Sequence, residues 1–125
     1  MTINLEFPRG LPAFEMHRRF RLVESREREP LLFLESETDP GLSFLLLPVG
    51  LIDPEYQLAL STEDRETLGA GPESSLRCLA VITAGEDSPP TANLLAPVVI
   101  NLNSGRAVQA VRSDSVYSHK KAICS

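Results

Sequence analysis

The stretch TANLLAPVVINLNSGRAVQAV, residues 91–111, decides the fold of this chain. Two apolar runs, residues 92–95 and 98–102, lie on either side of Pro97 and are typical of β-strands. The following Asn103-Ser104-Gly105 step supplies a glycine that can take the positive φ of a tight hairpin. We therefore expect residues 107–111 to fold back and pair antiparallel with the preceding strand.

Short apolar segments of the same kind continue on the N-terminal side of this hairpin. Alternation of apolar and polar residues predicts strands at 3–7 and 20–23, and denser apolar runs predict strands at 31–34, 43–47 and 76–83. Residues 116–117 are expected to begin a last short strand or tail. The charged stretch 24–29, the turn at 39–41 and the segment 85–90 are expected to be connections.

Helix signals occur only in the middle of the chain. Asp53-Pro54 suits the start of a helix, although the piece that would follow, residues 55–60, is equally compatible with an extended form. An acid three residues after Ser61, followed by Gly69, predicts one or two helical turns at 62–68. The sequence therefore predicts a mostly β protein, a small antiparallel β-barrel-like single domain over residues 1–125, because closure removes exposed sheet edges.

The composition agrees with one folded domain and excludes several classes of protein. The chain has 125 residues, of which 42% are hydrophobic and 23% charged. Its ten prolines and seven glycines are scattered throughout, which excludes a coiled coil or a helical bundle. The longest apolar run, residues 44–52, is far shorter than the roughly 20 residues of a membrane span. No secretory signal is visible, so we expect a cytoplasmic protein that does not contact membranes.

The net charge of −5 is distributed unevenly along the chain. Residues 31–91 carry eleven acids and two arginines, net −9, between ends that are net positive. An acidic surface favours a basic protein partner and repels nucleic acid, although solubility alone is an alternative explanation. The basic run HRRFR at 17–21 keeps an RNA-binding β-barrel open as the alternative function. Flanking glutamates oppose it, and we expect alternation to divide its charges between two faces of a strand.

Motifs for catalysis, cofactors or metals are not evident. The chain lacks a glycine-rich phosphate loop, and its two histidines, His17 and His119, have no metal-ligand spacing. A small hydrolase on a β-barrel would be a third class, but no residue stands out as its nucleophile. We therefore predict no enzymatic activity, no cofactor and no metal. Cys78 is expected to be a buried thiol and Cys124 a tail thiol, with a disulfide as the alternative.

Several blocks, taken together and in order, resemble the flagellar assembly factor FliW family. FPRGLPAFE at 7–15 resembles its opening signature, PLLFLES at 30–36 and LSFLLLP at 42–48 resemble the next two blocks, and PEY at 54–56 matches a further element. TANLLAPVVIN at 91–101 is closely similar to the family's Thr-x-Asn-Leu-x-x-Pro block. Ala13 replaces a preferred glycine, so a positive φ there would be strained. Glu35 replaces a usual glutamine and adds negative charge.

The resemblance implies a single FliW-like domain over 1–125, a small antiparallel β-barrel, and a non-enzymatic regulator. Members of the family bind the translational repressor CsrA and antagonise it, which releases flagellin messenger RNA. They also bind flagellin, and the two partners exchange. We expect this chain to be a monomer when free and to make no direct contact with nucleic acid.

The candidate contact residues follow from charge and from these blocks. CsrA binds RNA and must present basic surface, so we expect the acidic middle near that contact, with Glu35, Asp53 and Glu55 as the charged candidates. Tyr56 is a candidate aromatic anchor, with a core tyrosine as the alternative. Asn93 and Asn101 flank Pro97 and indicate a shaped bend, or an edge strand whose backbone groups are satisfied by side-chain amides. The functional alternative is an edge or groove that receives flagellin.

Overall fold

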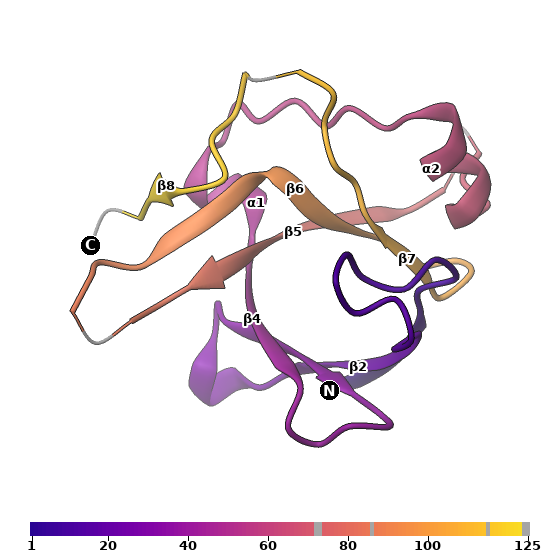
Figure 1. Cartoon of the computed structure of the whole chain (residues 1–125), viewed down its shortest axis with the longest axis horizontal. Coiled ribbons are helices and arrows are strands. Elements are labelled where there is room, and N and C mark those ends of the chain that lie inside the picture. The colour runs from indigo at the N-terminus through magenta and orange to yellow at the C-terminus, as the bar shows by residue number, and fades with distance from the viewer. Residues whose placement is uncertain (72–73, 86, 115, 124–125) are drawn as a thin grey trace.

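Seven strands close into a barrel in the computed structural model of the chain (Figure 1), and an eighth short strand extends the sheet. The structure describes residues 1–71, 74–85, 87–114 and 116–123. The strands are β1 (Thr2–Glu6), β2 (Arg19–Glu24), β3 (Leu32–Ser36), β4 (Ser43–Pro48), β5 (Leu76–Thr83), β6 (Thr91–Asn101), β7 (Arg106–Gln109) and β8 (Lys121–Ala122). Three short helical segments complete the fold, η1 (Arg26–Arg28), α1 (Val49–Ile52) and α2 (Thr62–Leu68).

Strands that follow one another in the chain are also neighbours in the barrel. Each of β1 to β6 pairs antiparallel with the next strand, and a parallel pairing of Glu6 with Arg106 closes the ring between β1 and β7. The predicted mostly antiparallel barrel and the hairpin at 103–105 are confirmed, and Gly105 has the expected positive φ of 76°. The last strand lies at Lys121–Ala122, where it pairs with the start of β6, so of the two alternatives for residues 116–117, strand or tail, the strand was wrong.

Alternating residues of the strands fill the barrel. Leu5, Phe20, Leu22, Leu34 and Leu46 are each at most 4% exposed. Burying one such side chain contributes roughly 1.5–3 kcal/mol. Inward-facing apolar residues therefore fix the pairing register, because a slip of one residue would turn them all to solvent.

A second apolar cluster lies outside the barrel, on the face of β4, β5 and β6. Val49 of α1 packs there against Ala80, Ile82 and Leu94. Asp53-Pro54 does not start a helix, because α1 ends at that point, and of the two alternatives for residues 55–60 the non-helical one is correct. Asp53 instead begins a β-turn in which Tyr56 N donates to Asp53 O at 3.0 Å, with proline at the second position of the turn, where its fixed φ is favourable.

The helix predicted at 62–68 is confirmed as α2. Asp64 N donates to Ser61 Oγ at 3.0 Å, the carboxylate of Asp64 accepts from Ser61 N, and Gly69 ends the helix with a φ of 66°. The buried amide of Asn101 donates to the Leu68 carbonyl at 2.9 Å. This bond attaches the end of α2 to β6.

Strand β6 bulges away from β5 at Pro97. Leu79 pairs with Val98 and Val81 with Asn93, so the four residues 94–97 lie opposite Ala80 alone. The side-chain oxygen of Asn93 accepts from Leu95 N at 3.1 Å and from Ala96 N at 3.0 Å. The expected bend with amide-satisfied backbone groups is therefore present at Asn93.

Other segments bind the remaining backbone groups of this bulge. Leu94 N donates to Ser118 O at 3.0 Å, and the Leu94 carbonyl accepts from Tyr56 Oη at 2.7 Å. The carbonyls of residues 95, 96 and 97 accept from Arg112 N, Gln109 Nε2 and Ala110 N at 3.0, 3.0 and 2.8 Å. Proline has no N–H to satisfy, which makes it suitable for this position.

The connection from β1 to β2 folds tightly over one end of the barrel. Ala13 has a φ of 70°, so the strain expected for a positive φ at this position is present. Gly10 also has a positive φ, and a side-chain carbon there would lie 2.5 Å from the backbone of Glu15.

Of the two cysteines, the structure describes Cys78. Cys78 lies half-buried on β5, and burial raises the pKa of its thiol to about 11. Cys124 falls outside the residues that the structure describes, so the expectation of a tail thiol is not tested.

Within the described residues, every helix is too short or too polar to cross a bilayer.

The bulge gives a first prediction. Asn93→Ala removes the acceptor for two backbone N–H groups and should lower the free energy of unfolding by about 2 kcal/mol. Asn93→Asp keeps an acceptor oxygen and should retain most of the stability. Urea denaturation followed by circular dichroism measures both, with the exposed Asn4→Ala on β1 as the matched control. A loss for Asn93→Ala no larger than that of the control would contradict this role.

Candidate functional site

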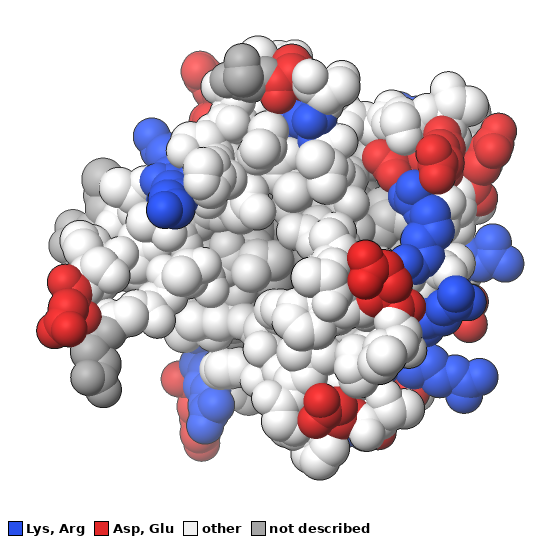
Figure 2. Space-filling model, in the orientation of Figure 1, with Lys and Arg blue, Asp and Glu red and all other residues white. Residues whose placement is uncertain are grey.

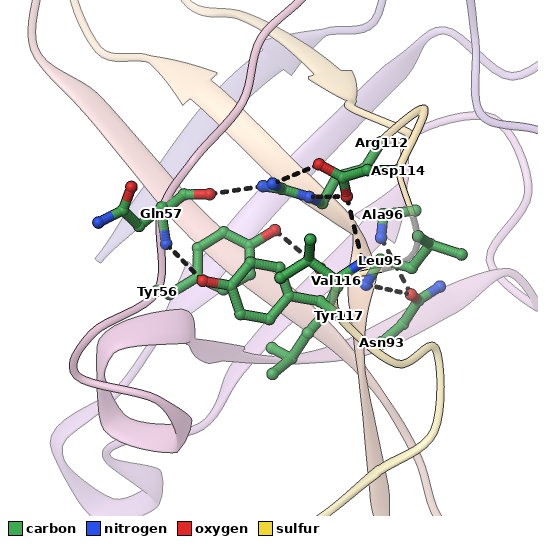
Figure 3. A network of polar contacts seen from close by, with 10 residues as sticks. Tyr56, Gln57, Asn93, Leu95, Ala96, Arg112, Asp114, Val116 and Tyr117 are labelled. Carbon is green, nitrogen blue, oxygen red and sulfur yellow. Dashed lines mark hydrogen bonds and ion pairs between the residues drawn. The ribbon is translucent and has the colours of Figure 1, made fainter.

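Four of the six predicted site residues lie in one region of the surface. Asp53, Glu55 and Tyr56 belong to the segment that follows α1, and the Tyr56 hydroxyl joins this segment to β6 one residue after Asn93. Glu35 and Asn101 lie elsewhere on the barrel. We therefore take residues 53–57, together with the chain segment that covers them, as the candidate site (Figure 3).

The two acids of this segment have different surroundings. The Asp53 carboxylate accepts from Glu55 N at 3.0 Å, which stabilises the turn, and its residue is half-buried. Glu55 is exposed, and only its backbone N takes part in the bond to Asp53. Glu55 is thus the acid of this pair that is free to meet a partner.

Tyr56 stacks on Tyr117 from the C-terminal part of the chain. Their ring centroids are 4.3 Å apart and nearly parallel, at 21°. The Tyr56 hydroxyl donates to Leu94 O, while the Tyr117 hydroxyl accepts from Gln57 N at 2.9 Å. Burial raises the pKa of Tyr56 above its ordinary value. The alternative of a core tyrosine with a satisfied hydroxyl is therefore correct for the hydroxyl, while the residue is only half-buried and also lines a surface hollow.

Arg112 connects the two stacked tyrosines to Asp114 and to the backbone of Gln57. Its guanidinium makes a bidentate pair with Asp114, at 2.9 and 3.0 Å, and also donates to the Gln57 carbonyl (Figure 3). The same group lies 4.8 Å from the centre of the Tyr117 ring and 5.7 Å from that of Tyr56. We call these five residues, Tyr56, Gln57, Arg112, Asp114 and Tyr117, the tyrosine–arginine clasp.

The clasp keeps its charges at neutral pH. The hydrogen bonds to Arg112 hold the pKa of Asp114 below its ordinary value of 3.8, and the same bonds raise the pKa of Arg112. Because the folded-state pKa of Asp114 is lowered, its contribution to stability is fully present above the ordinary value and is lost as the pH falls through the lowered value. Sequence reasoning missed Arg112 and Asp114, because a lone Arg–x–Asp pair in a loop carries no recognisable pattern.

An open hollow of about 790 Å³ lies beside the clasp. Glu55, Gln57 and the two tyrosines line it, together with Val116, which is 71% exposed. The hollow is wide and partly polar, so it suits side chains of a protein partner better than an enclosed small molecule.

The structure separates Glu35 and Asn101 from the clasp. Glu35 pairs across strands with Arg21 and Ser43, at the start of β4, whereas α1 follows the other end of that strand. Asn101 is only 1% exposed and its amide group holds α2 and the β6–β7 turn. Their proposed contacts with partners stay predictions.

The basic run at 17–21 is arranged differently from the expectation. Phe20 is fully buried, so Arg19 and Arg21 share the outer face of β2, and the expected division of charge between two faces was wrong. These arginines stand opposite Glu6 and Glu35 in the neighbouring strands. Acids therefore alternate with bases on this face, which weakens its attraction for a phosphate backbone.

Comparisons with known proteins agree with this geometry. The family described as FliW protein matches residues 2–123. The flagellar assembly factor FliW of Pseudothermotoga lettingae is 35% identical over 121 residues, covering 95% of this chain and 77% of that protein. That of Azoarcus sp. (strain BH72) is 37% identical over 114 residues, covering 86% and 78%. The crystal structure of the flagellar assembly factor FliW superposes with a TM-score of 0.88 at 26% identity, covering 98% of this chain and 86% of that one.

The clasp gives a second prediction. Arg112→Ala should lower the free energy of unfolding by roughly 2 kcal/mol, because it removes charge-assisted hydrogen bonds to Asp114 and to the Gln57 carbonyl. Amide hydrogen exchange in residues 55–58 should become faster than in the wild type, whereas exchange in the barrel strands should stay the same. Arg28→Ala is the matched control, since Arg28 also lies over an aromatic ring, that of Phe33, at 5.1 Å. Phe33 belongs to β3, which pairs with β2 and β4 and not with β6. Equal effects of the two variants on residues 55–58 would contradict the role of Arg112.

Proposed function

The chain belongs to the FliW family of flagellar assembly factors, and we propose that it binds the translational repressor CsrA and flagellin in turn. Binding CsrA antagonises its repression of flagellin messenger RNA, and flagellin competes for the assembly factor. The chain is a non-enzymatic regulator in this proposal, a monomer when free, and works in the cytoplasm. Free flagellin then sets its own synthesis by occupying the factor.

The exposed carboxylate of Glu55 beside the clasp carries the CsrA half of the proposal. An RNA-binding protein presents lysine and arginine to phosphate, and a carboxylate held on a fixed turn complements such a surface. The clasp fixes residues 53–57 before binding, so little conformational entropy is lost when a partner docks. The neighbouring tyrosine edges and Val116 supply apolar contact at the same place.

The end of β7 and the residues that follow it support the flagellin half. Val108, Gln109 and Val111 line a hollow of about 430 Å³ next to α2, so the C-terminal part of the range 92–111 offers a concave surface. A concave surface with both apolar and charged walls suits an amphipathic helix, and the terminal regions of flagellin are expected to form helices. Asn93 and Asn101 shape this region through their bonds to the backbone.

A third prediction tests the CsrA contact. Glu55→Lys should weaken CsrA binding about fivefold at low salt, and the effect should shrink as the salt concentration rises. Asp53→Asn should weaken it less, because an amide oxygen can still accept from Glu55 N and preserve the turn. Isothermal titration with purified CsrA measures both, with the exposed Glu27→Lys of η1 as the matched control.

The control also separates local from general effects of charge. A loss of affinity in Glu27→Lys equal to that in Glu55→Lys would indicate attraction by the net charge alone. Unchanged affinity in Glu55→Lys would remove this contact from the proposal. Glu35→Lys, on β3, tests whether the CsrA surface extends beyond the clasp.

A fourth prediction concerns flagellin. Amide hydrogen exchange within residues 92–111 should slow when monomeric flagellin is added, because the groove becomes covered. Residues 26–34, on the opposite side of the ring of strands, serve as the internal control. Binding of flagellin without any slowing in 92–111 would reject this groove as its site.

A further inference from the structure

We propose that the open end of the barrel and the adjoining side of α2 form one groove for a protein segment that carries an apolar side chain with a lysine or arginine nearby. The inference deepens the flagellin contact proposed above and rests on it for the identity of the natural partner. It adds the chemistry of the segment that the groove takes. We call this surface the mouth groove.

The apolar half of the mouth groove opens into the barrel itself. A cavity of about 60 Å³ is lined by Phe14, Phe44 and Val81, above the buried residues Leu34 and Val98. Phe14 is 38% exposed and meets Phe44 edge to face at 5.8 Å. The interior of the barrel is thus reachable at this end, and the space fits the tip of one apolar side chain.

The polar half lies between the β1–β2 connection and α2. Glu15, Glu63 and Asp64 line it with Arg9 as the sole base among its lining residues, so its net charge is −2. Arg9 pairs with Glu63 at 2.9 Å and with Asp64. Asp64 is buried in its capping bonds, whereas the Glu63 side chain is 73% exposed. Glu63 and the exposed Glu15 are therefore available to a cation from outside.

The two halves are continuous. Pro12 and Gln109 line both, and the Gln109 amide is fixed by its bond to the Ala96 carbonyl of the β6 bulge. Figure 2 shows the uncharged centre of this face next to acidic and basic side chains near α2. An apolar site that continues into an acidic one selects an apolar side chain and a cation together.

The wall of the groove is formed before a partner arrives. Gly10 allows the β1–β2 connection to pass within contact of the Glu15 backbone, and Ala13 holds a left-handed conformation. Strained backbone of this kind persists only where the surrounding structure holds it in place, and it is common at functional sites.

The acids of the groove also disfavour phosphate groups. A basic amphipathic protein segment therefore fits the groove better than RNA or an anionic membrane does.

Peptide selection tests the mouth groove without assuming any natural partner. Random dodecapeptides displayed on phage are selected on the wild-type protein and depleted on the double variant Phe14→Ser/Glu63→Lys. We expect enriched peptides to share an apolar residue with a lysine or arginine within about four positions, one helical turn. A synthetic peptide of that sequence should bind about tenfold more weakly to Phe14→Ser and about fivefold more weakly to Glu63→Lys.

Matched controls lie on the same two elements. Met16→Ser changes an 86% exposed side chain of the β1–β2 connection, and Glu66→Lys changes an exposed acid of α2; neither residue lines the groove. Both should bind the peptide like the wild type. Glu15→Lys, an exposed position, repeats the charge test without touching the Arg9 pair.

The outcomes separate the groove from the proposed function. Enrichment that depends on Phe14 and Glu63 supports the groove, even if flagellin fails to bind, in which case the flagellin contact is rejected. Enriched peptides without a base, or no enrichment that depends on these residues, would overturn the groove. Flagellin binding that both variants leave unchanged would also overturn it while leaving the proposed function intact.

Discussion

The backbone of the β6 bulge is the constraint on which the rest of the structure depends. Between Asn93 and Val98 the strand leaves the ladder of β5, and its N–H and C=O groups need other partners. An unpaired buried backbone group costs about 1–3 kcal/mol, so a bulge of this length is stable only if nearly all are bonded. Asn93 provides acceptors within the strand, and the remaining groups are bonded by segments far away in the chain.

These bonds determine where the functional surfaces lie. Tyr56 Oη and Arg112 N bind the carbonyls of residues 94 and 95, and this places the tyrosine–arginine clasp over the bulge. Gln109 binds the next carbonyl and so fixes the wall between the two halves of the mouth groove. The clasp and the groove are therefore adjacent surfaces attached to one irregular stretch of strand. A regular strand would leave these side chains without their partners.

Much of this fold could be predicted from local sequence, and the parts that could not depend on distant contacts. Alternation around Phe20 and Leu22 identified a strand, and Ser61 with Gly69 identified α2, because those signals lie within a few residues. The four-residue helix α1 is too short for a periodic pattern, and it forms because Val49 packs on the outer sheet face. The clasp joins Tyr56 to Arg112 and Tyr117, and a single sequence does not reveal contacts across such separations.

Counting acids overstates the negative charge that a partner can meet. The middle of the chain carries eleven acids, yet Asp53 and Asp64 use their carboxylates to bind backbone N–H groups of a turn and a helix start. Such carboxylates are part of the fold, and their charge is already partly compensated by the N–H dipoles. Glu55 beside the clasp is exposed instead, and Glu63 beside the mouth groove is also largely exposed, although it pairs with Arg9. The location of these exposed carboxylates, rather than the net charge, therefore decides which surfaces attract a basic partner.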